Sequence, residues 1–127
     1  MDLLLLLTIL VTLLFLSISV FQVFLALGFP LGEFAMGGFY KVLPLKLRIV
    51  SMVNAIILLM MNVLFLQYTG VVSGFDFLPV TIFVWLITGF LFLNTVANYF
   101  SKSDKEKKVM TPLSALMCVC CLLIILL

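Results

Sequence analysis

The sequence predicts an all-α membrane protein, with a single bundle of four transmembrane helices in one domain, residues 1–127. Two observations support this prediction. Apolar residues make up 66% of the chain and charged residues only 9%, whereas a soluble domain averages about 25% charged residues. Four apolar runs also approach or exceed the roughly 20 residues that a helix needs to cross a bilayer. Too few charged side chains are present to cover a water-soluble surface, so lipid is the expected solvent.

The apolar runs place the expected helices at about residues 3–27, 49–67, 80–98 and 109–127. The first run is too long for the apolar part of a signal peptide and has no basic residues before it, so we expect a retained helix. Pro44, Pro79 and Pro112 each stand before an apolar run or at its start, and proline suits the first helical turn. We therefore expect Thr111 to cap the last helix, Asp76 to cap the third, and no proline to interrupt a span.

Basic residues predict the orientation. All seven lie in the two connections that precede the second and fourth helices: Lys41, Lys46, Arg48, Lys102, Lys105, Lys107 and Lys108. The N-terminus and residues 68–78 have none. Because basic loops stay in the cytoplasm, we expect both termini to lie outside it.

Small polar residues recur within the apolar runs at helical spacing. The amides among them are expected to face the bundle interior, since an amide in lipid needs a hydrogen-bonding partner: Gln22, Asn54, Asn62 and Asn94. One interpretation is that these polar faces join the helices, at about 0.6 kcal/mol per hydrogen bond. The other is that they line a polar pocket or path along the bundle axis.

Several chemistries are not expected from this composition. Histidine is absent, and Cys118, Cys120 and Cys121 are too close together on one helix to form a disulfide easily. We therefore expect neither a metal nor a cofactor. The apolar runs contain no acid or base, which disfavours ion-coupled transport. The short mixed-charge run at residues 101–108 is not expected to bind nucleic acid.

The connection at residues 28–40 is unusual because it is apolar, aromatic and rich in glycine, which argues against a regular helix. We expect it at the cytoplasmic interface, where its backbone amides and the cations that follow could bind an anionic lipid headgroup. The residues of this candidate site are Gly28, Pro30, Gly32, Glu33, Gly37, Gly38, Lys46 and Arg48.

Glu33 is the one acid in this connection and allows two interpretations. In a partly apolar niche its pKa would rise, and it could act as an acid or bind a cation. Alternatively, it caps backbone N–H groups or pairs with Lys41, Lys46 or Arg48. We favour the second.

The first connection also resembles that of small four-helix bacterial membrane proteins with no assigned activity. Their pattern is Gly-x-Pro-x-Gly, Gly-Gly and Leu-Pro-x-x-Leu-Arg-x-x-Ser, which here falls on Gly28, Pro30, Gly32, Gly37, Gly38, Leu43, Pro44, Leu47, Arg48 and Ser51. A second similar patch comprises Asn98, Ser101, Ser103, Glu106 and Pro112. The resemblance implies a multi-pass protein of the bacterial cytoplasmic membrane.

Three classes of function fit these observations. We expect first a structural or accessory protein that binds membrane lipid or partner helices, through self-association or another membrane protein. The alternative is an oligomeric transporter or channel for a neutral or amphiphilic solute. The third, an enzyme that uses Glu33, is ranked last because the sequence offers no nucleophile–base pair, and we expect no enzymatic activity.

Overall fold

The computed structural model describes residues 2–74 and 77–127, and within these residues all regular secondary structure is helical. The four long helices are α1 (Leu3–Ala26), α2 (Leu45–Thr69), α3 (Val80–Tyr99) and α4 (Asp104–Leu126). This confirms the predicted all-α architecture of four helices. The expected cap at Asp76 lies outside the described residues.

Two helices begin earlier than the hydropathy pattern predicts. α2 starts directly after Pro44, four residues before the predicted start, and α4 starts at Asp104 rather than near residue 109. The cap of α4 is Ser103, whose Oγ accepts the N–H of Glu106 at 3.3 Å, so the prediction of Thr111 as the cap is wrong. Pro112 consequently lies inside α4, contrary to prediction. Because proline has no N–H, the carbonyl of Lys108 loses its helical donor, but Lys108 is exposed.

The connection between α1 and α2 contains two single turns of 3₁₀ helix, η1 (Gly32–Phe34) and η2 (Met36–Gly38). We call residues 32–38 the bridging segment. Gly32 is required here by close packing, because a Cβ atom at this position would lie 2.0 Å from the carbonyl oxygen of Tyr40. Its own N–H donates to the carbonyl of Lys41 at 2.8 Å, which closes the base of the connection.

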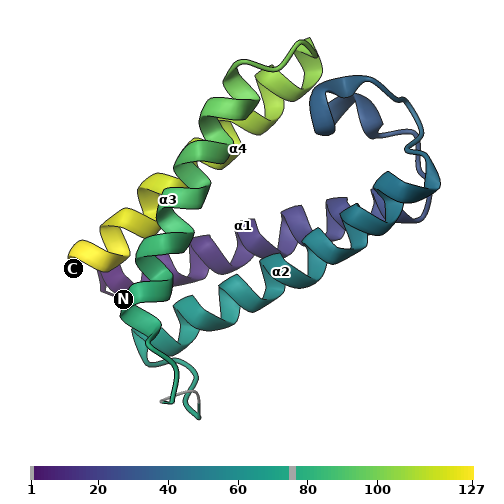
Figure 1. The fold of residues 1–127 in the computed structure, drawn as a ribbon. Helices are drawn as coiled ribbons and strands as arrows, with labels where there is room; N and C mark the ends of the chain where they lie inside the picture. Colours follow the sequence, from purple (N-terminus) through teal and green to yellow (C-terminus); the bar gives the residue numbers. More distant parts are fainter. Residues whose placement is uncertain (1, 75–76) are drawn as a thin grey trace.

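The helices form two hairpins that meet at one end and diverge toward the other (Figure 1). Where they meet, beside the two termini, an apolar core includes Phe15, Phe65, Val84 and Cys121. At the diverging end, the bridging segment lies across the gap and contacts α4. The bundle is therefore closed by packing at one end and by a loop at the other.

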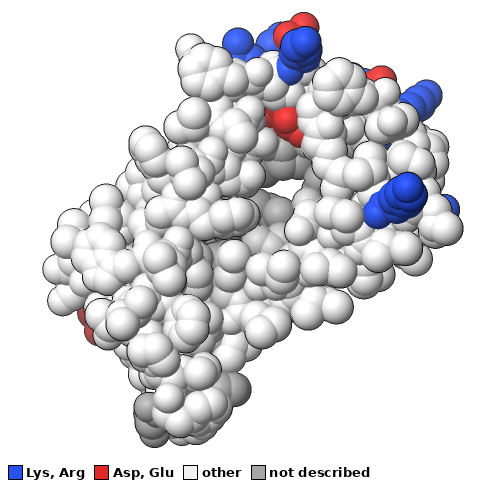
Figure 2. Space-filling view, viewed as in Figure 1, with Lys and Arg blue, Asp and Glu red and all other residues white. Residues whose placement is uncertain are grey.

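The outer faces of the helices are covered with exposed leucine, isoleucine, valine and phenylalanine side chains. All four helices are long and apolar enough to cross a membrane. The chain is therefore a multi-pass integral membrane protein. The basic side chains visible in Figure 2 cluster at the diverging end, opposite the termini.

Candidate functional site

A cavity of about 390 Å³ lies between the two hairpins. This volume is within the range of about 300–1,000 Å³ that is typical of small-molecule sites. All four helices and the bridging segment line it, and Figure 2 shows it as a hollow on the side of the molecule. Because the hollow opens between the helices rather than at their ends, it faces the lipid of a surrounding bilayer.

Amide side chains line the cavity from both hairpins. On the α1–α2 wall, Gln22 Oε1 accepts the hydroxyl of Ser51 at 2.6 Å, and the same hydroxyl reaches the backbone oxygen of Gln22 at 2.7 Å. Asn54 faces the cavity from α2 and makes no side-chain hydrogen bond within the described part of the chain. Polar groups of this wall are thus available to a ligand.

The α3–α4 wall carries a second polar group. Asn94 and Asn98, one turn apart on α3, donate their Nδ2 groups to the hydroxyl of Ser114 at 3.3 Å and 2.9 Å. Both amide oxygens therefore remain available as acceptors. Glu106 completes this wall at the end nearest the bridging segment.

Glu106 is the buried acid of the cavity, with only 5% of its surface exposed. In a capping box, the glutamate three residues after the cap accepts the N–H of the cap residue. Here the Ser103 N–H donates instead to Ser101 Oγ at 3.1 Å, and Glu106 Oε2 accepts the N–H of Gly37 at 3.3 Å. The carboxylate therefore joins α4 to the bridging segment.

The four amides that the sequence predicts to be interior do not all reach this cavity. Gln22, Asn54 and Asn94 line it, from three different helices. Asn62 is buried on α2 away from the cavity lining, and its Oδ1 has no hydrogen-bond partner among the described residues. Other polar groups join α1 to α2 directly. The hydroxyl of Ser19 in α1, for example, donates to the carbonyl of Ala55 in α2 at 3.2 Å, which fits the interpretation that polar faces join the helices.

The eight residues of the predicted headgroup site do not form one site in the structure. Arg48 Nε donates to the carbonyl of Ala26 at 2.9 Å, next to Gly28, and so completes the C-terminal end of α1. Pro30 and Lys46 are exposed. The remaining four, Gly32, Glu33, Gly37 and Gly38, belong to the bridging segment.

The glycine amides do not form an anion cradle. The N–H groups of Gly28, Gly32 and Gly38 donate to backbone carbonyls of Leu25, Lys41 and Ala35. The N–H of Gly37 donates to Glu106, as described above. Each of these donors has a protein acceptor, so a headgroup could bind them only by displacing one of these hydrogen bonds.

Glu33 pairs with Lys105 at the start of α4, and not with Lys41, Lys46 or Arg48 as predicted. The hydrogen bond and charge of Lys105, with a smaller contribution from Lys41, lower the pKa of Glu33 below its ordinary value of 4.5. The alternative of a raised pKa is therefore wrong. The backbone oxygen of Glu33 also accepts the hydroxyl of Ser103, so Glu33 is a structural link between the hairpins.

No protein-family model, curated protein or solved structure matches this chain. The chemistry of the cavity is therefore inferred from its own residues.

The sequence-based site does not include four polar residues of the cavity lining: Asn98, Ser101, Glu106 and Ser114. Asn98 and Glu106 lie at or beyond the predicted helix ends, where helical spacing does not predict an interior position. A usable signal existed in the spacing Ser103-x-x-Glu106, which marks a helix start. Continued from there, Glu106, Met110 and Ser114 share one face of α4.

Proposed function

We propose that this chain is an accessory membrane protein that holds one amphiphilic molecule, a lipid or a lipid-like compound, between its two hairpins. One observation carries the proposal: the cavity combines amide and carboxyl groups with apolar side chains such as Phe90, Leu91 and Met117. An amphiphile needs both kinds of surface. Because the hollow faces sideways, such a molecule can enter from the bilayer without crossing water.

The proposal includes an orientation. We place the diverging end in the cytoplasm of a bacterial cell, because all seven basic residues lie in the two connections at that end or in the first turns of the helices that follow them. An amphiphile held with its polar head beside the bridging segment would then be aligned with the lipids of the cytoplasmic leaflet. The exposed apolar outer faces remain suited to self-association or to another membrane protein.

A second candidate function is transport of an amphiphilic solute. The favouring observation is that a short segment, tied to α4 by few polar contacts, covers the loop end of the cavity. Flux of an amphiphile across reconstituted vesicles would support transport, and binding without flux would support the accessory role. Catalysis by Glu33 is not part of the proposal, because that side chain pairs with Lys105 and does not line the cavity.

Native mass spectrometry of the protein released from lipid nanodiscs tests the binding function. We expect one retained molecule of defined mass for each copy of the chain. Ala97→Trp, which adds bulk inside the cavity, should abolish retention. Leu93→Trp on the exposed face of the same helix is the matched control and should leave it unchanged. Retention of variable bulk lipid alone, equal in both variants, would refute the proposal.

A further inference from the structure

The cavity contains a buried carboxyl group that has no cationic partner among the described residues. Glu106 is 5% exposed, and within the described residues no Lys or Arg forms an ion pair with it. Burying a carboxylate without a cation is costly. The positive end of the α4 dipole and the Gly37 N–H offset part of that cost. The other carboxylate oxygen, Oε1, makes no hydrogen bond among these residues, and Glu106 lines the cavity.

The Asn98 side chain on the α3–α4 wall offers an acceptor rather than a donor. The Nδ2 groups of Asn94 and Asn98 each donate one N–H to the Ser114 hydroxyl, and each Oδ1 remains free to accept. Asn98 also approaches the carbonyl of Met110, one helical turn from Glu106, at 3.5 Å. A ligand head that meets Glu106 and the Asn98 oxygen must therefore supply hydrogen-bond donors, and a positive charge would compensate Glu106.

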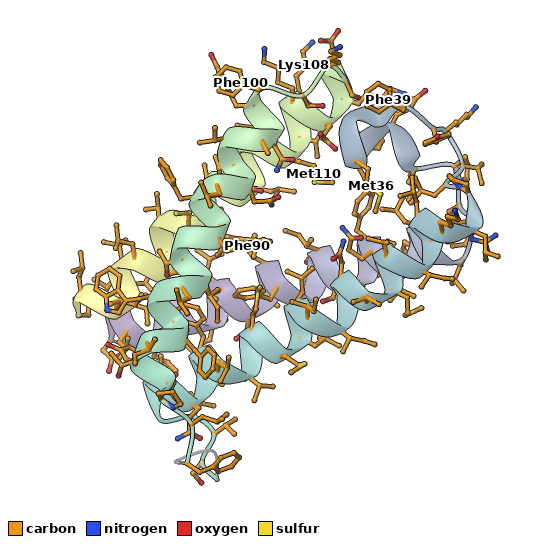
Figure 3. The ribbon with its side chains drawn as sticks, in the orientation of Figure 1. Met36, Phe39, Phe90, Phe100, Lys108 and Met110 are labelled. Atoms are coloured by element: carbon orange, nitrogen blue, oxygen red, sulfur yellow. The ribbon has the colours of Figure 1, made fainter. Side chains whose placement is uncertain are left out.

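The remainder of the cavity is apolar. In Figure 3, Met36 from the bridging segment, Met110 from α4 and Phe90 from α3 point into the space between the hairpins. Methionine side chains adapt to irregular ligand shapes, so these walls suit an alkyl chain better than a rigid ring system. The polar and apolar parts place a head near Glu106 and a chain directed toward Phe90.

We propose that the amphiphile carries a protonated amine head, which binds the Glu106 carboxylate and the Asn98 amide oxygen. This inference rests on the proposed function and specifies its ligand class. No basic residue lines the cavity among those described, so nothing there repels a cation. Lys105, the neighbouring cation, pairs with Glu33 on the outside of the segment.

The test compares dodecylamine with dodecanol, which has the same chain and a neutral head. Each is added to the protein in nanodiscs, and binding is measured by native mass spectrometry. The wild type should bind dodecylamine at least about tenfold more tightly, as expected for hydrogen bonds to a charged group. Glu106→Gln should bind the two probes equally. Asp104→Asn removes an exposed acid from the same helical turn and should keep the preference.

Each other outcome is also decisive. Equal binding of both probes by the wild type, or an unchanged preference in Glu106→Gln, would overturn the amine head but keep the binding function. Binding of neither probe would refute both proposals. If Glu106→Gln does not fold, Asn98→Leu serves instead, and it should reduce the preference for the amine while dodecanol binding persists.

Discussion

Gly37 and Glu106 are 69 positions apart in the sequence, yet the N–H of Gly37 donates to the Glu106 carboxylate at 3.3 Å. Two neighbours of Glu106 bind the same segment, since Ser103 donates to the Glu33 backbone oxygen and Lys105 pairs with the Glu33 side chain. The first turn of α4 thus holds the connection of the other hairpin. This contact closes the loop end of the cavity and places the acid within it.

Gly32→Ala should destabilise the protein. The added Cβ would lie 2.0 Å from the carbonyl oxygen of Tyr40, so the backbone must shift, at a cost of about 1–3 kcal/mol for overpacking. Thermal unfolding in detergent measures the loss. Gly89→Ala in α3 is the control, because a Cβ there meets no atom within 4 Å, and it should be neutral or slightly stabilising. Equal melting temperatures for the two variants would contradict the close approach.

Ser51→Ala should weaken the α1–α2 hairpin. The Ser51 side chain is fully buried and its hydroxyl bonds both oxygens of Gln22, so its removal should cost about 0.6–1.7 kcal/mol. The free energy of unfolding in mixed micelles gives the value. Ser17→Ala, on the exposed side of α1, should change it by less than about 0.5 kcal/mol. A loss as large in Ser17→Ala would show that the Ser51 bonds are not the cause.

Stability should fall in acid because of Glu33. Lys105 lowers the pKa of Glu33 in the folded protein, so the pair stabilises the fold above the ordinary pKa of 4.5 and is lost as the pH falls through the lower folded value. Glu33→Gln and Lys105→Gln should each flatten the dependence of melting temperature on pH below 4.5. Lys108→Gln, an exposed cation of the same helix, should leave it unchanged. Unaltered acid sensitivity in both pair variants would exclude this ion pair as its source.

A topology reporter fused after Leu127 should be active outside the cytoplasm. The expectation follows from the basic residues, which lie at the end opposite the C-terminus. A reporter inserted at Lys102 should show the reverse activity. Cytoplasmic activity at Leu127 would invert the proposed orientation.

The sequence predicts the spans well and the helix starts poorly. The bounds of α1 and α3 agree with prediction to within one residue, because their apolar runs and their helices nearly coincide. For α2 and α4, hydropathy marks only the part expected in lipid. Each helix begins earlier, at a proline or a serine cap, in a stretch that carries charges.

The candidate cavity was predicted only in part, for a different physical reason. The spacing of polar residues within each helix predicts that Gln22, Asn54 and Asn94 face inward, because an amide side chain has no hydrogen-bonding partner in lipid. It does not reveal that the first connection packs against α4. The cations nearest Glu33 in the sequence are therefore the wrong partners, and proximity in the sequence does not indicate Lys105, 72 positions away.

The two ends of the bundle are joined by interactions that respond to different conditions. Beside the termini, Phe15 and Phe65 pack with ring centroids 6.2 Å apart, and dissolved ions have no direct effect on such contacts. At the opposite end, the exposed pair of Glu33 and Lys105 is screened by salt. Ionic strength on the loop side of the membrane should therefore alter the separation of the hairpins, whereas ionic strength on the other side should not.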